Sequence, residues 1–264
     1  MKRSIYDSDH EAFRDSVREF LDREVKPHLE EHAEAHAMPR EMWLAAGKQG
    51  FLGLEIPEQY GGSEAGDYRY NAVLTEELAK VNMALASCVG IHADIVAPYL
   101  VHLTTEEQRE RWLPKFCTGE ILTAIGMTEP SGGSDLAGLR TTAVRDGDDY
   151  VLNGQKIWCS RAAHADWGFG LFRSDPEAQK HAGLTYFLFP LDASGVTVRP
   201  IAQLDGEPGF AEVFFDDVFV PDCDVLGAPG DGWRVAMSTA GNERGLSLRS
   251  PGRFCAAADR LVAA

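Results

Sequence analysis

Residues 123–135 read Thr-Ala-Ile-Gly-Met-Thr-Glu-Pro-Ser-Gly-Gly-Ser-Asp, and residues 151–160 read Val-Leu-Asn-Gly-Gln-Lys-Ile-Trp-Cys-Ser. Each stretch contains apolar or β-branched residues typical of a strand, together with glycine that indicates a turn. Each also contains a hydroxyl side chain and backbone amides that can hydrogen-bond a ligand. The two stretches therefore predict strands of a β domain, with hydroxyls that could hydrogen-bond a ligand or cap loops.

The chain before these stretches has a helical pattern. Ser8 and Glu11 have capping-box spacing, and apolar residues follow at helical spacing in a charged segment. A second helix is predicted for residues 39–50, with proline in its first turn. Two further helices are expected within residues 68–102, and another within residues 104–119.

From residue 121 the chain instead shows short β-branched or aromatic runs separated by Gly, Asp and Pro, with a predicted hairpin turn at residues 146–148. Helical periodicity returns near residue 232. We expect an α+β fold with an N-terminal helical domain at 1–120, a mostly antiparallel β-barrel or sandwich domain at 121–228, and the first helices of an incomplete C-terminal helical domain at 229–264. The expected strands are 121–127, 139–146, 149–154, 166–173, 184–190, 196–202 and 211–220.

Composition excludes several classes of function. The chain has 264 residues, is 44% hydrophobic and carries a formal net charge of −16, so it can form a large core but offers no basic surface for nucleic acid or an anionic membrane. Its five cysteines lack metal-ligand spacing, which predicts no metal site and fits a reduced cytoplasm. No targeting signal is found, and no window approaches the ~18 apolar residues of a membrane span.

Several motifs in order along the chain share a known pattern. Residues 51–62 read Phe-Leu-Gly-Leu-Glu-Ile-Pro-Glu-Gln-Tyr-Gly-Gly, residues 108–114 read Gln-Arg-Glu-Arg-Trp-Leu-Pro before Gly119-Glu120, and residues 127–135 read Met-Thr-Glu-Pro-Ser-Gly-Gly-Ser-Asp. These resemble the GLxGLxxPExYGG, QxxxxLP…GE and TEPxxGSD signatures of the acyl-CoA dehydrogenase family. The resemblance covers essentially the whole chain, and it implies the same order of helical, β and helical parts.

The resemblance implies FAD as the cofactor. The residues matching Thr128 and Ser160 hydrogen-bond the pyrimidine edge and N5 of the flavin in the family, the residue matching Trp158 flanks the ring, and Ser134 matches a position between flavin and substrate. The residues alone also allow an alternative without a cofactor, in which Trp158 lies in the core and the two hydroxyls cap loops. No GxGxxG follows a strand, so a Rossmann site has no support. The full implied FAD-binding set is Ile125, Met127, Thr128, Ser134, Trp158 and Ser160.

The resemblance also implies a catalytic base. α,β-Dehydrogenation of an acyl-CoA thioester needs a base for the α proton, and a desolvated carboxylate with a raised pKa can serve. Some family members carry this glutamate on the first helix after the β domain, and Asn242-Glu243-Arg244 resembles that segment. We therefore predict Glu243 as the base, with Ser134, Asn242 and Arg244 contacting substrate. The alternative from the residues alone is a solvated helix glutamate beside an arginine.

Two departures from the family pattern leave alternatives open. Arg161 stands where Asn is common, and the sequence ends at Ala264 where family members continue into a helical bundle. The alternatives are a flavin-dependent monooxygenase or oxidase of the same fold that lacks a carboxylate base, against which Glu243 argues, or a truncated or scaffold subunit that is inactive alone. The implied partners are an acyl-CoA substrate, an electron-transfer flavoprotein or similar acceptor, and a homo- or hetero-oligomer when the bundle is present. No nucleic acid partner is expected.

Overall fold

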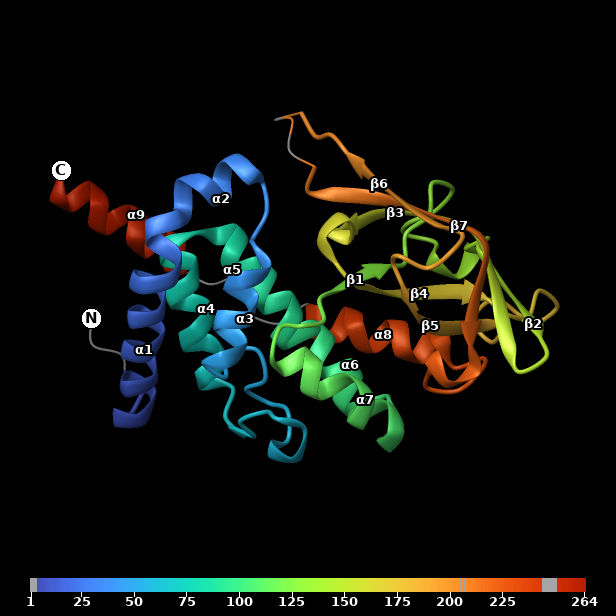
Figure 1. Ribbon diagram of the computed structural model, residues 1–264, viewed down its shortest axis with the longest axis horizontal. Helices are drawn as coiled ribbons and strands as arrows, with labels where there is room; N and C mark the ends of the chain where they lie inside the picture. Colours follow the sequence, from blue (N-terminus) through green and yellow to red (C-terminus); the bar gives the residue numbers. More distant parts are fainter. Residues whose placement is uncertain (1–3, 205, 207, 244–250) are drawn as a thin grey trace. The chain divides into compact units, whose positions relative to one another are not determined.

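The structure is a computed structural model that describes residues 4–204, 206, 208–243 and 251–264, without the side chains of residues 239–243 (Figure 1). It divides into two compact units. The helical unit comprises Met1–Val101, Arg109–Glu120 and Gly241–Ala264, and the sheet unit comprises His102–Gln108 and Ile121–Ala240. One division between the units falls between Glu120 and Ile121, and residues 229–264 are shared between both units.

Helices occupy most of the first 120 residues, as predicted. The N-cap of the first helix lies one residue earlier than predicted, because the side chain of Asp7, not Ser8, accepts the amide hydrogens of Asp9 and His10. His10 replaces Glu11 as the reciprocal partner in this capping box. The helices of this part are α1 (Ser8–Phe20), α2 (Leu29–Ala35), α3 (Arg40–Lys48), α4 (Arg69–Val81), α5 (Met83–Gly90), α6 (Ala97–His102) and α7 (Glu106–Cys117), and α9 (Gly252–Ala263) follows late in the chain.

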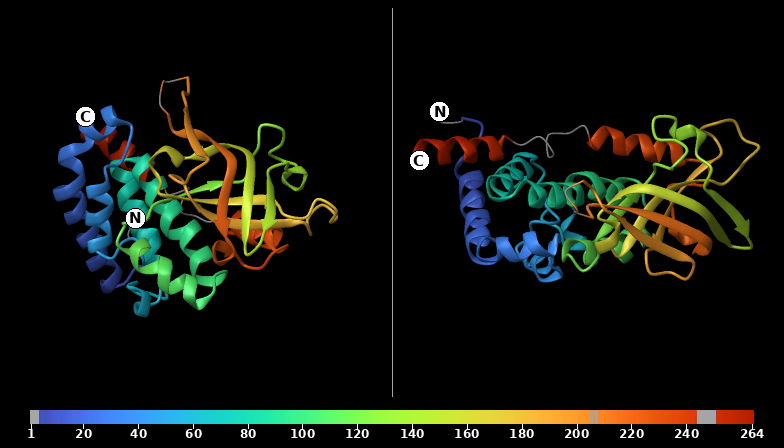
Figure 2. Two further views of the ribbon diagram at one scale, coloured as in Figure 1. Left: turned by 45° about the vertical axis from the view of Figure 1, so that its right-hand side comes forward. Right: turned by 90° about the horizontal axis from the view of Figure 1, so that it is seen from above.

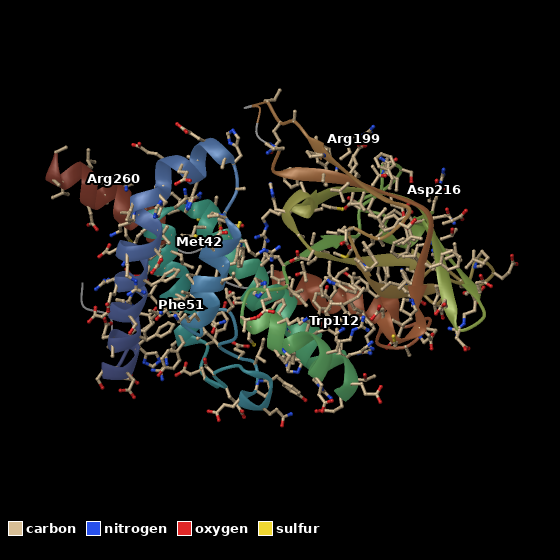
Figure 3. The ribbon with its side chains drawn as sticks, in the orientation of Figure 1. Met42, Phe51, Trp112, Arg199, Asp216 and Arg260 are labelled. Carbon is tan, nitrogen blue, oxygen red and sulfur yellow. The ribbon has the colours of Figure 1, made fainter. Side chains whose placement is uncertain are left out.

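The helical unit combines aromatic packing with buried charge. Phe51, labelled in Figure 3, packs edge to face with Phe13 and Phe20, with ring centroids 5.7 and 5.3 Å away. Between α1 and α4, the Arg14 guanidinium donates to Glu77 Oε1 at 2.6 Å, and both side chains are buried. Buried ions need such partners, so this pair ties α1 to α4.

One segment differs from the sequence prediction. Met83–His102 is long and apolar enough to cross a membrane by length and composition, with a mean hydropathy of 1.6 over its most apolar window. That window is 61% buried within the protein. A core helix passes the same test, because it is apolar on most of its faces. We therefore interpret Met83–His102 as a core segment of the fold.

The sheet unit contains an eight-stranded mixed sheet in the order β6-β7-β3-β2-β4-β5-β8, and β1 pairs with β4. Most pairs are antiparallel, but β1 runs parallel to β4 and β2 meets β4 in parallel at one position. The sheet curls around its core without forming a closed barrel from the described strands (Figure 2). The strands are β1 (Thr123–Gly126), β2 (Thr142–Asp146), β3 (Asp149–Ser160), β4 (Trp167–Arg173), β5 (Leu184–Pro190), β6 (Val196–Ile201), β7 (Phe210–Pro221) and β8 (Val225–Leu226).

Aromatic side chains fill the core of this sheet. Phe172 lies edge to face with Phe187, Phe189 and Phe215, at centroid distances of 5.8, 6.0 and 5.0 Å. All four rings are buried, so they supply much of the apolar area that stabilises the sheet. Helix α8 (Gly232–Glu243) begins directly against this unit, because a Cβ on Gly232 would lie 2.8 Å from the Leu184 carbonyl oxygen.

Strand β3 carries two irregularities. Its pairing with β7 shifts between Leu152 and Gly154 and again between Lys156 and Cys159. At the first shift Gly154 has φ +126°, and an added Cβ would lie 2.6 Å from Thr141 Cγ2, so only glycine suits this position. The second shift inserts an extra residue opposite β7 and shapes the end of the strand that was predicted to carry a site.

Candidate functional site

Trp158 projects from the second irregularity of β3. Its φ of +61° is uncommon for a bulky residue and costs free energy unless the surroundings impose it. The indole is 53% exposed, with one edge-to-face contact to Phe210 at 5.8 Å between ring centroids. This exposure excludes the alternative in which Trp158 is a core residue. A large aromatic ring held outward by strained backbone is typical of a ligand-binding surface.

Two residues with predicted hydroxyl contacts to the cofactor lie beside this bulge. The backbone amide of Ile157 donates to the Thr128 carbonyl oxygen at 2.9 Å, which places the loop after β1 directly beside the bulge. Ser160 pairs with Phe210, the residue that also contacts the Trp158 ring. Thr128 and Ser160 are half-buried, and neither hydroxyl is hydrogen-bonded to the part of the chain that the structure describes. Both hydroxyls are therefore available to a ligand.

The loop that follows Thr128 folds back over it. A Cβ on Gly133 would lie 3.5 Å from Thr128 Cγ2, so the Gly-Gly-Ser-Asp run passes close to Thr128. Ser134 is exposed in this loop, whereas Ile125 and Met127 are half-buried at the end of β1 and just after it. The segment from β1 to Ser134 thus stands beside the end of β3, as the predicted site requires.

A buried ion pair lies beneath this surface. Lys156 Nζ donates to Glu129 Oε1 at 2.9 Å, and the two side chains are 0% and 3% exposed. The Glu129 carboxylate also accepts from the Arg140 amide at 2.6 Å, the Thr141 amide at 3.0 Å and Thr141 Oγ1 at 2.6 Å. The carboxylate is therefore fully bonded in a place where an unpaired charge would be very unfavourable.

Both members of this pair are charged near neutral pH. Burial lowers the pKa of Lys156 to about 8, although the charge of Glu129 opposes that shift. Burial by itself would raise the pKa of Glu129, but the charge of Lys156 and the hydrogen bonds from Thr141 and Arg140 outweigh it and hold this pKa below its usual value. The neighbouring Cys159 is a different case, since burial raises the pKa of its thiol to about 12 and leaves it unreactive.

Sequence reasoning singled out neither Lys156 nor the role of Glu129. A signal was present, because Tyr150, Leu152 and Lys156 all fall on the buried face that period-two alternation defines in β3. A lysine on the inward face of a strand needs a buried acid, and the glutamate after Thr128 was one of several candidates in the sequence. The partner itself could be chosen only once β1 and β3 were placed side by side.

The predicted catalytic segment is described in part. The backbone places Asn242 and Glu243 in the last turn of α8, after the sheet as predicted, but their side chains lie outside the described residues. Arg244 also lies outside the described residues. No group of three or more His, Cys, Asp or Glu side chains suited to a metal ion occurs among the residues that were described.

The residues present fit a flat aromatic cofactor with a polar edge. The exposed indole of Trp158 offers a surface for ring contact, and the unbonded hydroxyls of Thr128 and Ser160 offer hydrogen bonds beside it. FAD has such a ring, so these three residues would hold its isoalloxazine edge.

Models of two domains of one known family match most of the chain up to residue 218. The acyl-CoA dehydrogenase N-terminal domain matches residues 7–120, and the acyl-CoA dehydrogenase middle domain matches residues 124–218. The chain belongs to the acyl-CoA dehydrogenase family. The resemblance noted from the motifs is thereby confirmed, and the helical and mixed-sheet architecture is that of the family.

Individual members of the acyl-CoA dehydrogenase family agree with this assignment. The chain is 38% identical over 249 residues to the mitochondrial long-chain specific acyl-CoA dehydrogenase of Mus musculus, covering 92% of this chain and 56% of that protein. It is 43% identical over 198 residues to acyl-CoA dehydrogenase IpdE1 of Mycobacterium tuberculosis, covering 75% and 51%. The chain thus spans about half the length of these relatives.

Solved structures of acyl-CoA dehydrogenases share the fold. The acyl-CoA dehydrogenase from Geobacillus kaustophilus superposes with a TM-score of 0.86 at 40% identity, covering 92% of this chain and 64% of that chain. A glutaryl-CoA dehydrogenase from Mycobacterium smegmatis, solved in complex with FADH2, gives a TM-score of 0.78 at 29% identity, covering 90% and 60%.

Proposed function

We propose that this chain is the FAD-binding part of an enzyme that α,β-dehydrogenates an acyl-CoA thioester. The observation that carries the proposal is the exposed Trp158 ring on the β3 bulge, with Thr128 and Ser160 on the adjoining backbone and their hydroxyls unbonded within the described chain. Family membership supports it, as does the reduced flavin bound by the similar glutaryl-CoA dehydrogenase.

Seven of the predicted residues have a specific role in this proposal. When bound, FAD accepts the hydride that leaves the β carbon of the acyl chain. Thr128 and Ser160 hydrogen-bond the ring edge and so orient it, while Trp158 covers the ring and excludes water from one side. Glu243 takes the α proton onto its carboxylate, and Ser134, Asn242 and Arg244 hold the thioester and the CoA portion.

The proposal includes partners that suit this chemistry. Electrons must leave the cofactor after each turnover, so we propose an electron-transfer flavoprotein or similar acceptor as the redox partner. A homo- or hetero-oligomer is proposed for the protein with its C-terminal helical bundle. CoA is polyanionic and the chain has a net charge of −16, so local cations rather than the overall field must hold it.

Anaerobic reduction tests the reaction. The 264-residue chain, mixed with FAD and freed of excess, is expected to show a bound-flavin spectrum that bleaches when saturated acyl-CoA esters of several chain lengths are added without oxygen. Bleaching distinguishes a dehydrogenase from an oxidase-type protein that lacks a carboxylate base. A bound flavin that keeps its colour with every ester would contradict the proposed reaction, and absence of any bound flavin would favour an inactive subunit.

Ser160→Ala is expected to weaken FAD binding. Losing one hydrogen bond costs about 1 kcal/mol, equivalent to roughly a fivefold rise in the dissociation constant. The measurement is flavin titration of the flavin-free protein followed by tryptophan quenching. Ser174→Ala is a suitable control, because Ser174 lies just after β4 and bonds Thr185 Oγ1 at 2.6 Å instead of facing the proposed site. Equal affinities for Ser160→Ala and the parent chain would remove Ser160 from the site.

A further inference from the structure

We propose that Lys156 and Glu129 are positioning residues of the flavin site, whose buried ion pair sets the spacing between Thr128 and the bulge that carries Trp158. The inference rests on the proposed function of these two segments. Neither residue is exposed enough to touch a ligand, so both act through the residues they hold.

The lysine acts on both sides of Thr128. Its ammonium donates to the Met127 carbonyl oxygen at 3.4 Å and to the Glu129 carboxylate at 2.9 Å. The next residue of β3 completes the connection, because the Ile157 amide donates to the Thr128 carbonyl oxygen at 2.9 Å. Residues 127–129 are thus bound one after another to Lys156 and Ile157, immediately before Trp158.

The glutamate extends this connection to a third segment. Its carboxylate accepts the amide hydrogens of Arg140 and Thr141 at the entrance to β2, at 2.6 and 3.0 Å. The loop that contains Ser134 leaves from Glu129 and returns at Arg140, so both ends of that loop are attached to one carboxylate. The Glu129 and Gly132 backbones also bond each other in both directions, which closes the first turn of the loop.

Both the aliphatic part and the ammonium group of Lys156 make close contacts inside the sheet unit. A Cβ on Gly126 would lie 3.4 Å from Lys156 Cγ, so the stem passes directly against the end of β1. The ammonium lies 5.0 Å from the centroid of the Phe172 ring, where the negative face of the ring attracts a cation. These contacts leave the Lys156 side chain little conformational freedom. The length of this side chain therefore fixes the distance between β3 and the loop after β1.

Stability alone is a weak reason for such a pair. The desolvation of two buried charges offsets most of their attraction, and apolar replacements of similar volume are often neutral or stabilising. Directional bonds give something that apolar packing cannot, namely a defined distance between the segments that they join. A positioning role therefore predicts that removing both charges recovers stability relative to either single change without restoring the site.

Three variants of the full chain separate a stabilising role of the ion pair from a positioning role. They are Lys156→Met, Glu129→Gln and the double variant. Phe187→Leu serves as a matched control, because Phe187 is a buried core residue that no hydrogen bond joins to Glu129 or Lys156 within the described part of the chain. Urea unfolding reports stability, hydrogen exchange of the Ile157 amide in flavin-free protein reports the spacing, and titration with FAD reports the site.

Both single variants are expected to be destabilised, since each leaves a buried polar partner behind. The double variant is expected to unfold at a higher urea midpoint than either single variant, because it leaves no unpaired charge buried. It should still exchange the Ile157 amide at least roughly tenfold faster than the parent and bind FAD at least roughly tenfold more weakly, the loss expected from breaking a bond to a charged group. Phe187→Leu should lower stability while keeping near-parent values for local exchange and for FAD affinity.

Two results would overturn the inference. One is a double variant with parent-like exchange at Ile157, which would show that the ion pair does not set the spacing. The other is faster exchange with unchanged FAD affinity, which would show that the spacing does not matter to the site. A parent chain that binds no FAD would contradict the proposed function instead, and the exchange measurement in flavin-free protein would still decide whether the pair holds the segments together.

Discussion

Glu243→Gln is expected to slow reduction of the flavin by saturated acyl-CoA by about 10²- to 10⁴-fold, the usual contribution of a positioned proton acceptor. Glutamine preserves the size and hydrogen bonding of the side chain but cannot accept the α proton. The backbone of Glu243 closes the last turn of α8, so the substitution leaves the start of that helix intact. Binding of the acyl-CoA should therefore change little while the chemical step slows.

Stopped-flow bleaching under anaerobic conditions measures this effect, with the FAD-loaded protein and the ester that reduces the parent fastest. Asp231→Asn is the matched control, since Asp231 precedes the other end of α8, where its carboxylate is paired with Arg234. The control should bleach at the parent rate. If Glu243→Gln also bleached at a near-normal rate, the base would have to be a different carboxylate, from a further part of the protein or from a partner subunit.

Phe172→Ala is expected to lower the free energy of unfolding of the sheet by about 3 to 5 kcal/mol, because it leaves a cavity where one ring meets three others. Domains are typically stable by only about 5 to 15 kcal/mol, so this loss is a large part of the total. The ring also lies beneath the Lys156 ammonium, and its removal should weaken FAD binding as well.

Urea unfolding followed by circular dichroism measures the change in stability. Phe219→Ala is the control, because Phe219 on β7 is 61% exposed and its truncation should change stability by less than about 0.5 kcal/mol. Figure 3 identifies this region of the sheet by the labelled Arg199 of β6 and Asp216 of β7. Equal losses for the two phenylalanine variants would contradict the aromatic cluster as the main core of the sheet.

Local patterns in the sequence predicted most elements correctly. The strand at 184–190 was expected with the bounds that the structure has, and the hairpin at residues 146–148 formed as its Asp-Gly-Asp turn indicated. Such signals depend only on residues close together in the sequence, so they can be recognised without the tertiary structure. The cap of α1 was misplaced by one residue, because Asp7 and Ser8 are both good caps and only the backbone conformation selects between them.

The candidate site was predicted in part. The motifs located Thr128, Trp158 and Ser160 in two segments, and the structure brings Thr128 beside Ile157 and presents the Trp158 ring to solvent. The exposure of Trp158 was not predictable from its residue type, since tryptophan is on average well buried. The exposure of Trp158 follows from an extra residue in β3 opposite β7. Such a bulge forms only against a particular partner strand, which the sequence of β3 does not reveal.

The sequence by itself determined the order of helical and β parts and the family, and it indicated the residues proposed to hold a flavin, because these depend on periodicity and on motifs contiguous in the chain. Only the tertiary structure decided that β1 runs parallel to β4, that Trp158 is outside the core and that Lys156 pairs with Glu129. The physical reason is that strand pairing and buried charge pairing join residues distant in sequence. Their free energy is defined only when the fold has brought those residues together and removed water from around them.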